Sequence, residues 1–236
     1  MIPCKTIDFA IMTVARPQAY IHDFIGQLRA DLPIRLVVGS PDSNYLKRYR
    51  ENPFVEILEP PVSEWEYFRN FKVHHRAAWN YWRSLSLGIR SPNRHGLVVF
   101  EDDLVPAHCW EEQFYKIIDQ IEMRHSTLYL LALYAPYDNL PEPIPETNFV
   151  LYPTDWFYGT QAIYYPEIVR LEFIKYLKSN GVDTHHHPYD RVLRDYLLEM
   201  KIPIFAAMPC LFQHVGEITT GLGGRFHSTS RFQTKP

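Results

Sequence analysis

Two patterns of apolar residues alternate along the chain: short runs of consecutive apolar residues, and longer segments with apolar residues every three or four positions. A run such as residues 97–100 (LVVF) predicts a strand buried on both faces, as in a parallel sheet covered by helices. The spacing of three and four predicts amphipathic helices between the strands. Strands are predicted at 7–14, 34–38, 55–58, 97–100, 127–134, at the end of 156–166 and at 202–207, and helices at 18–32, 43–49, 71–87, 110–123, 167–177 and 188–200.

The order of these elements predicts the fold class. Strand and helix alternate from residue 7 to 58, which implies parallel strands joined by right-handed crossovers. Residues 63–70 and the proline-rich segment 135–153 are predicted to be loops, and 202–207 is expected to be the final strand. We therefore expect an α/β protein with a mixed, mainly parallel sheet flanked by helices.

The chain shows no internal repeat and no boundary between domains. We expect one domain over residues 1–220, followed by a C-terminal tail at 221–236. The tail contains three glycines and several hydroxyl residues, so it is expected to be flexible without ligand and able to close over one.

Composition narrows the function classes only slightly. The 236 residues are 46% apolar and 22% charged, which is ordinary for a globular protein. Aromatic residues make up 15%, which suits a sugar- or nucleotide-binding cleft, although a large core explains them nearly as well. The formal net charge of −3 gives no electrostatic reason to expect nucleic acid or an anionic membrane as a partner.

Cysteine usage and hydropathy bear on the compartment. Cys4, Cys109 and Cys210 are odd in number and form no CxxC pair, which disfavours a disulfide framework or a structural zinc site. The sequence contains no 18-residue apolar run and no signal-peptide pattern. We expect a soluble, cytoplasmic protein without a membrane anchor.

Glu101, Asp102 and Asp103 follow directly after the apolar run at 97–100. A buried strand places such carboxylates at its C-terminal end, the edge where open α/β sheets bind ligands. Three adjacent carboxylates repel one another unless a cation or hydrogen-bond donors offset the charge. Oxygen ligands favour Mg²⁺ or Mn²⁺, ions that keep positions open for substrate phosphates. The segment is therefore interpreted either as a divalent-metal site for a phosphorylated ligand or as a solvated acidic turn.

Asp190 is a candidate general base, because it lies in the first turn of the helix predicted at 188–200. An ordinary first-turn aspartate is the alternative interpretation. Asp183 and Asp195 are weaker candidates for the same role.

Histidines and arginines near the C-terminus could complete a site. Adjacent histidines at 185–187 cannot all face one site, whereas His214 could join a metal shell or contact a phosphate, or be an ordinary loop histidine. Arg225 and Arg231 lie in the tail, where guanidinium groups could pair with a diphosphate or remain solvated.

Two further groups of side chains are harder to assign. Arg76, Asn80 and Arg83 share one sector of the helix predicted at 71–87 and are interpreted as a solvated face. Several aromatic side chains would suit a glycan or another hydroxylated substrate, though core packing explains each of them: Trp65, Tyr67, Trp156 and Tyr158.

Several motifs occur in an order that resembles one enzyme group. Residues 98–104 (VVFEDDL) resemble the acidic motif of inverting N-acetylglucosaminyltransferases of the GT-A fold. Residues 110–114 (WEEQF) and 71–76 (FKVHHR) are similar to N-acetylglucosaminyltransferase I, and 188–193 (PYDRVL) and 209–216 (PCLFQHVG) to N-acetylglucosaminyltransferase IV. The motifs are scattered between residues 7 and 225. This chain departs from those enzymes in being short, without an anchor, stem or lectin-like extension, so its donor and acceptor cannot be inherited from them.

The resemblance implies a single-domain, Rossmann-like GT-A fold and a role for each matching residue. Asp103 would bind the metal directly, Glu101 would lie towards the ribose and Asp102 towards the donor sugar, and Asp190 would be the base. The remaining implied donor-binding residues are Thr13 and Arg16 at the nucleoside, Arg76, and His214 and Arg225 over the diphosphate.

The expected function is a metal-dependent inverting glycosyltransferase, with Mn²⁺ or Mg²⁺, that moves a sugar from a UDP-sugar to a glycan or other hydroxylated acceptor. GlcNAc is the first choice of sugar. Alternatives are a retaining enzyme of the same fold, a non-catalytic UDP-sugar-binding module and a metal-dependent phosphoesterase. A sugar-nucleotide pyrophosphorylase is disfavoured, because residues 13–16 (TVAR) lack its glycine-rich loop.

Overall fold

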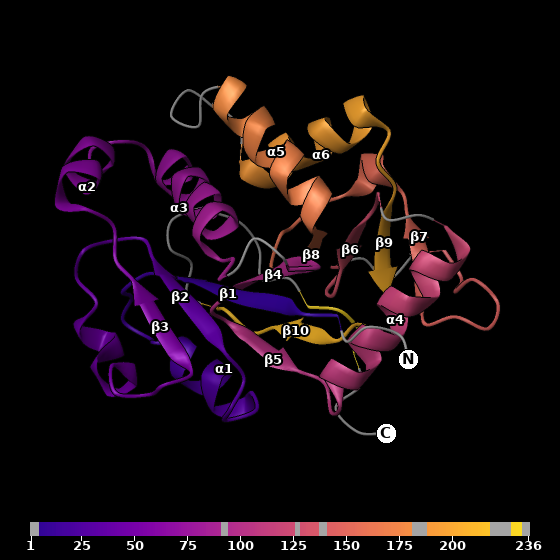
Figure 1. Cartoon of the computed structure of the whole chain (residues 1–236), viewed down its shortest axis with the longest axis horizontal. Helices are drawn as coiled ribbons and strands as arrows, with labels where there is room; N and C mark the ends of the chain where they lie inside the picture. The colour runs from indigo at the N-terminus through magenta and orange to yellow at the C-terminus, as the bar shows by residue number, and fades with distance from the viewer. Residues whose placement is uncertain are drawn as a thin grey trace.

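A computed structural model describes residues 5–90, 94–125, 128–136, 141–180, 188–217 and 228–232, and its main feature is one large β-sheet (Figure 1). The strands of this sheet are β1 (Ile7–Thr13), β2 (Ile34–Val38), β3 (Val55–Leu58), β4 (Gly96–Glu101), β6 (Leu130–Ala132), β7 (Phe149–Tyr152), β8 (Ala162–Pro166) and β9 (Ile204–Ala207). A separate two-stranded sheet pairs β5 (Leu104–Pro106) with β10 (Phe212–His214).

The large sheet is mixed and mainly parallel, as expected. Its strand order is β3-β2-β1-β4-β8-β6-β9-β7. The first four strands of this order are mutually parallel, and β6 and β9 are parallel to each other. Only β8 and β7 run antiparallel to their neighbours. The Rossmann-like α/β class is therefore confirmed, including the parallel β1-β2-β3 unit.

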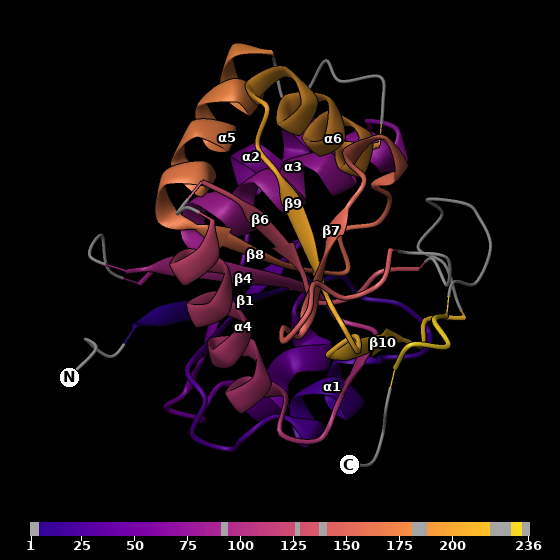
Figure 2. The ribbon, with the colours of Figure 1, turned by 90° about the vertical axis from the view of Figure 1, so that its right-hand side faces the viewer.

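Helices cover both faces of the sheet (Figure 2). The α-helices are α1 (Ile21–Gln27), α2 (Val62–Phe68), α3 (Val73–Leu87), α4 (Trp110–Arg124), α5 (Glu167–Ser179) and α6 (Tyr189–Met200), and the 3₁₀ helices are η1 (Asn44–Tyr49) and η2 (Thr154–Trp156). Helices α1 and α4 share one core with the side chain of Phe100, whereas α3, α5 and α6 share the other with that of Val99. Successive residues of β4 thus face opposite cores, which explains its continuous apolar run.

Several predicted boundaries differ from the structure. The predicted loop at 63–70 is wrong, because residues 62–68 form α2, whose Phe68 ring stacks on Trp79 at 4.8 Å. The helix predicted at 18–32 is shorter, and the segment at 43–49 is a 3₁₀ helix. The proline-rich segment contains β7, and 202–207 is not the final strand, because β10 follows it.

The predicted solvated face of α3 is also wrong for two of its residues. Asn80 and Arg83 are only 3% and 2% exposed. Nη1 of Arg83 donates a hydrogen bond to the carbonyl of Val38 (2.6 Å), and Nη2 donates one to the carbonyl of Leu58 (3.2 Å). These buried bonds satisfy carbonyls at the ends of β2 and β3 and tie α3 to both strands.

The described part of the tail lies against the segment that follows β9. The amide of Cys210 donates to the carbonyl of Arg231 (3.0 Å), and Gln213 and Thr229 exchange two hydrogen bonds of 3.2–3.3 Å. Of the tail predicted at 221–236, residues 221–227 and 233–236 lie outside the described residues, so its closure over a ligand stays a prediction.

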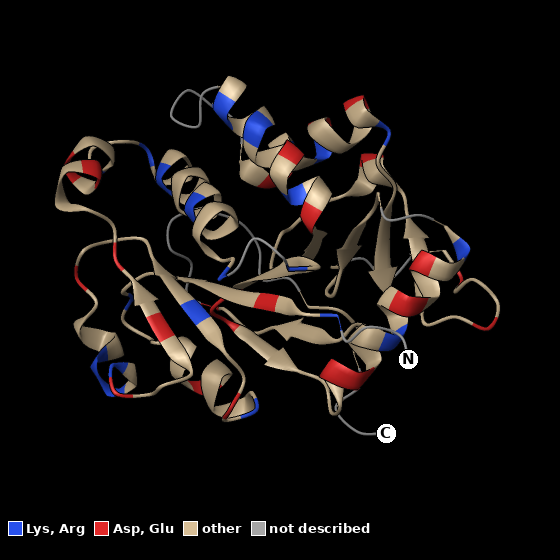
Figure 3. Ribbon diagram, in the orientation of Figure 1, with Lys and Arg blue, Asp and Glu red and all other residues tan. Residues whose placement is uncertain are grey.

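Charge is mixed over the described ranges. Basic and acidic residues are interspersed along the helices that flank the sheet (Figure 3). Neither Cys109 nor Cys210 forms a disulfide within these ranges. Within these ranges, no helix combines the length and the apolar composition that a bilayer crossing requires.

Candidate functional site

The three consecutive carboxylates lie where β4 ends and β5 begins. Glu101 is the last residue of β4 and pairs with Met12 of β1, so the ends of these two strands lie side by side. Asp102 and Asp103 are 3% and 5% exposed. Because they are buried, the interpretation as a solvated acidic turn is wrong.

Donors from the end of β1 offset the charge of the aspartates. Oγ1 of Thr13 donates to Oδ2 of Asp102 at 2.6 Å. The guanidinium of Arg16 pairs with both aspartates, through Nη2 to Asp102 and through Nη1 to Oδ2 of Asp103 at 3.2 Å. Tyr45 donates in turn to Thr13 at 3.3 Å, and burial raises the pKa of Tyr45 to about 12, so its hydroxyl remains protonated.

The short β10 brings His214 to the same place. His214 pairs with Leu104, the residue after Asp103, and its Nε2 lies 3.4 Å from Oδ2 of Asp103. The amide of Val215 donates to the carbonyl of Asp103 at 2.9 Å. Burial alone would raise the pKa of Asp103, but the hydrogen bond and charge of His214 and the charge of Arg16 hold that pKa below its usual range.

Glu101, Asp103 and His214 form a cluster that fits a divalent cation. One ligand atom from each lies within 4.8 Å of the others. Oδ1 of Asp103 is buried and has no hydrogen-bond partner among the described residues, which leaves a ligand atom available. Burial and the negative charge of Asp103 raise the pKa of Glu101 to about 7. Ionising Glu101 is therefore unfavourable in the absence of a cation, and a bound cation would offset that penalty.

The first two residues of α6 connect this cluster to the candidate base. The hydroxyl of Tyr189 donates to Oε1 of Glu101 at 2.8 Å, and its ring stacks on Tyr81 at 4.5 Å. Asp190, the next residue, is 8% exposed, and its Oδ2 accepts a hydrogen bond from the amide of Gly159 at 3.4 Å. Gly159 has a φ of 84°, a conformation that favours glycine. The start of α6 is therefore held both at the carboxylates and at the loop before β8.

Most residues expected at the site meet there, with two exceptions. The hydrogen bond of Arg76 goes to the carbonyl of Arg69 at 3.3 Å, near the start of α3, so its role in donor binding stays a prediction. Arg225 and the histidines at 185–187 lie outside the described residues. The residues brought together are Thr13, Arg16, Glu101, Asp102, Asp103 and His214, with Asp190 close by on α6.

Three residues of the site were not expected from the sequence. Tyr189 carries no signal beyond its place beside Asp190, and Tyr45 carries none. Gly216 belongs to the motif at 209–216, and a Cβ on it would lie within 3.0 Å of both Asp103 and His214. The glycine at the end of this motif is the one signal in the sequence that could have indicated a close approach at this position.

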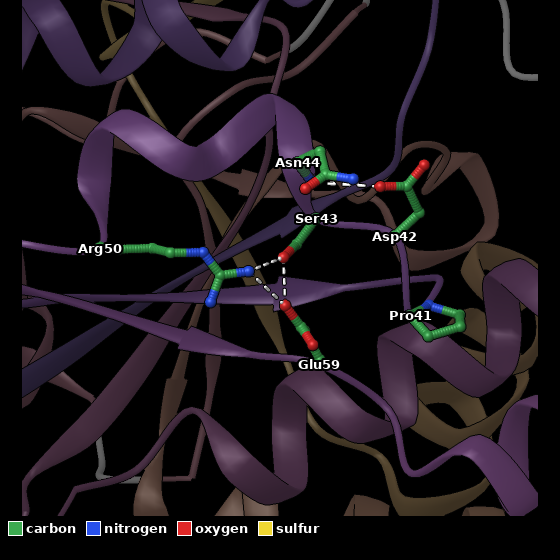
Figure 4. Close-up of a pocket in the computed structure, with 6 residues that line it drawn as sticks. All are labelled: Pro41, Asp42, Ser43, Asn44, Arg50 and Glu59. Atoms are coloured by element: carbon green, nitrogen blue, oxygen red, sulfur yellow. Dashed lines mark hydrogen bonds and ion pairs between the residues drawn. The ribbon is translucent and has the colours of Figure 1, made fainter.

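A pocket of about 420 Å³ lies beyond the carboxyl ends of β2 and β3 (Figure 4). Nη2 of Arg50 donates to Ser43 (2.6 Å) and to Glu59 (2.8 Å), and the amide of Asn44 donates to Asp42 (3.1 Å). The hydrogen bonds from Ser43 and Arg50 lower the pKa of Glu59. In the 3₁₀ helix η1, Asn44 lines this pocket and the next residue, Tyr45, hydrogen-bonds to Thr13. The pocket therefore adjoins the carboxylate site.

Comparison with known proteins yields only a distant likeness. No known protein family matches the sequence, and no curated protein is significantly similar to it. One similar solved structure is described as mannose-1-phosphate geranyltransferase from Thermus thermophilus. Its TM-score is 0.45 and its sequence identity 9%, over 86% of this chain and 73% of that chain. At this level the likeness carries no argument about the reaction of the present chain.

Proposed function

We propose that this protein is a metal-dependent glycosyltransferase that uses a UDP-sugar, with GlcNAc the first choice, and transfers the sugar with inversion to a hydroxyl acceptor. One observation carries the proposal: Glu101, Asp103 and His214 converge within 4.8 Å at the carboxyl edge of the sheet. The buried Oδ1 of Asp103, which has no hydrogen-bond partner among the residues that the structure describes, supports a cation there. The resemblance of the motifs to N-acetylglucosaminyltransferases of the GT-A fold supports the reaction class.

Asp103 is the proposed direct ligand of Mn²⁺ or Mg²⁺. Glu101 and His214 are the other proposed ligands from the protein. A divalent ion supplies charge neutralisation for a departing diphosphate. Hard cations bound by few carboxylates keep positions for substrate phosphates, which fits a site that is complete only with the donor. Asp102, whose carboxylate is held by Thr13 and Arg16, is the proposed acceptor of hydrogen bonds from the donor sugar.

The pocket beside η1 is proposed to hold the nucleoside of the donor. This hollow opens to the surface after β2 and adjoins Thr13 through Tyr45. Asp42 and Asn44 offer the acceptors and donors that a nucleobase edge requires.

Asp190 is the proposed general base. It is nearly buried, and Tyr189 links the start of its helix to Glu101 at the cation site. In this role its carboxylate takes the proton from the acceptor hydroxyl as that oxygen attacks the anomeric carbon from the face opposite the diphosphate. A retaining enzyme would not use Asp190 as a base, and the anomeric configuration of the product, read by NMR, distinguishes the two outcomes.

The test is thermal unfolding with UDP, with and without Mn²⁺. At a concentration 100 times its dissociation constant, UDP should stabilise the protein by about 2.7 kcal/mol, or about 5–10 °C, only with the metal present. Asp103→Asn should lose this shift. Asp31→Asn, at a carboxylate that is 63% exposed, is the matched control and should keep it. A Mn²⁺-dependent shift retained in Asp103→Asn would contradict the proposal.

A further inference from the structure

Two exposed aromatic residues lie in the segment between β7 and β8, whose Gly159 hydrogen-bonds to the proposed base. Trp156 is 48% exposed and Tyr158 is 38% exposed, whereas Phe157 between them is 3% exposed. The segment therefore alternates outward, inward and outward over three residues. We call Trp156 and Tyr158 the aromatic pair.

The backbone that carries the aromatic pair is fixed. The ring of Phe157 packs edge-on against Tyr152 at 5.8 Å, which anchors the segment in the core. The amides of Trp156 and Phe157 donate to the carbonyls of Pro153 (2.9 Å) and Thr154 (3.0 Å). The two rings are therefore presented to solvent on an ordered turn.

The aromatic pair is also tied to the proposed catalytic residue. The amide of Gly159, directly after Tyr158, donates to Oδ2 of Asp190, and η2, which ends at Trp156, contacts α6. Single exposed aromatics are common on protein surfaces and need no explanation. Here, two exposed aromatic residues flank the buried Phe157, and the next residue, Gly159, hydrogen-bonds to Asp190.

The chemistry of such rings indicates what binds them. Trp and Tyr offer large, rigid surfaces with a negative face and a polar tip, and they lose little conformational entropy on binding. A pyranose ring carries polarised C–H groups on one face and hydroxyls around its rim. The C–H face suits the aromatic surface, while a rim hydroxyl can reach a neighbouring carboxylate.

We propose that Trp156 and Tyr158 form the acceptor platform of this protein and that its acceptor is a carbohydrate. This inference rests on the proposed glycosyltransferase function. In the transfer step, the acceptor hydroxyl gives its proton to the Asp190 carboxylate and its oxygen bonds to the anomeric carbon. The bond from that carbon to the diphosphate oxygen breaks, and its electron pair leaves with the nucleoside diphosphate.

Binding of methyl glycosides of N-acetylglucosamine, mannose, galactose and glucose tests the platform, by saturation-transfer NMR with UDP and Mn²⁺ present. At least one should bind the wild-type protein with saturation strongest at its ring C–H protons. Trp156→Ala and Tyr158→Ala should each weaken that binding about tenfold or more, which is about 1.4 kcal/mol, and Trp156→Phe should restore most of it. Phe54→Ala is the matched control, because Phe54 is 39% exposed but precedes β3 at the opposite edge of the sheet.

The thermal shift with UDP and Mn²⁺, measured on every variant, separates this inference from the proposed function. It should be unchanged in all of them, which also shows that they fold. If the shift is absent from the wild-type protein while Trp156-dependent glycoside binding remains, the platform stands and the UDP-sugar function fails. The platform is overturned if no glycoside binds, if only a hydroxyl-bearing peptide binds, or if Trp156→Ala binds glycosides as tightly as the wild type.

Discussion

Gly216 lies against the carboxylate of Asp103 so closely that a side chain at position 216 has no room. A Cβ there would overlap Oδ2 of Asp103, and it would lie 2.8 Å from Cγ of Asp103 and 3.0 Å from Nε2 of His214. The aspartate cannot turn away freely, because Arg16 and His214 both pair with it. Residue 216 therefore sets the space in which the proposed metal ligands meet.

Gly216→Ala is expected to weaken Mn²⁺-dependent UDP binding at least about tenfold, or about 1.4 kcal/mol, because the methyl group must displace Asp103 or His214. Isothermal titration with UDP, with and without Mn²⁺, measures this. Gly26→Ala is the control: it lies in α1, and a Cβ there has no atom within 4 Å. That control should keep UDP affinity and gain up to about 1 kcal/mol of stability. Equal UDP affinities in the two variants would contradict the prediction.

Asp190→Asn is expected to reduce sugar transfer about 10²- to 10⁴-fold, because an amide cannot accept the acceptor's proton. UDP binding with Mn²⁺ should not change. Transfer is measured as UDP release that depends on acceptor. Asp195→Asn, on the same helix and 51% exposed, is the matched control and should be fully active. Wild-type turnover in Asp190→Asn would remove it as the base.

Tyr189→Phe removes the only hydroxyl contact that joins α6 to Glu101 among the described hydrogen bonds. Leaving a buried acceptor without its donor costs about 1–3 kcal/mol, so the melting temperature should fall by roughly 2–12 °C. The transfer rate should fall as well, since the start of α6 also carries Asp190. The control is Tyr196→Phe in the same helix, because the buried Tyr196 hydroxyl has no hydrogen-bond partner among the described residues. A larger loss of stability in Tyr196→Phe than in Tyr189→Phe would refute this account.

The metal-free protein is expected to lose stability as pH rises from 5 to 8. Burial and Asp103 raise the pKa of Glu101 to about 7 in the folded chain, from 4.5 in the unfolded chain. The folded state thus binds this proton more tightly, so the stabilisation is complete below pH 4.5 and disappears as pH rises through 7. The lowered pKa of Asp103 acts only in the acid range, because its contribution is lost below the usual pKa of an aspartate.

Urea unfolding in the presence of a chelator measures this pH dependence. Glu101→Gln keeps an acceptor for Tyr189 but cannot ionise, so its free energy of unfolding serves as the reference. The wild type should lose stability relative to this variant between pH 5 and 8. A constant difference over that interval would show that Glu101 does not titrate there.

Most strands of the large sheet were predictable because their signal is local, although β7 lies in a segment that was predicted to be a loop. The apolar runs at 34–38 and 55–58 coincide with β2 and β3, and the helix predicted at 71–87 ends where α3 ends, at Leu87. The three-residue strands β5 and β10 were not predictable, because each exists only through pairing with a segment about 100 residues away. Helix α2 was missed because its aromatic and polar residues form no clear apolar stripe. Its packing depends on the contact of Phe68 with Trp79, which the local sequence does not show.

The site was predictable where residues are adjacent in sequence and not where the fold brings them together. Glu101, Asp102 and Asp103 stand out as a run, but nothing local shows that Tyr189 donates to Glu101 from 88 positions away. Likewise, the helical pattern identified the sector of α3 that carries Arg83. It could not show that buried strand carbonyls, rather than water, accept its hydrogen bonds.

Arg16 gives the folded chain its own counter-ion for the aspartates. Proteins whose liganding residues are held together only by a metal unfold when that metal is removed. Here the guanidinium of Arg16 pairs with both aspartates and offsets part of their charge before any cation arrives, so we expect the chain to fold without the metal. On the proposed function, the ion would serve the transfer reaction and would not be needed to hold the fold together. We expect a chelator to silence this protein reversibly while leaving it folded.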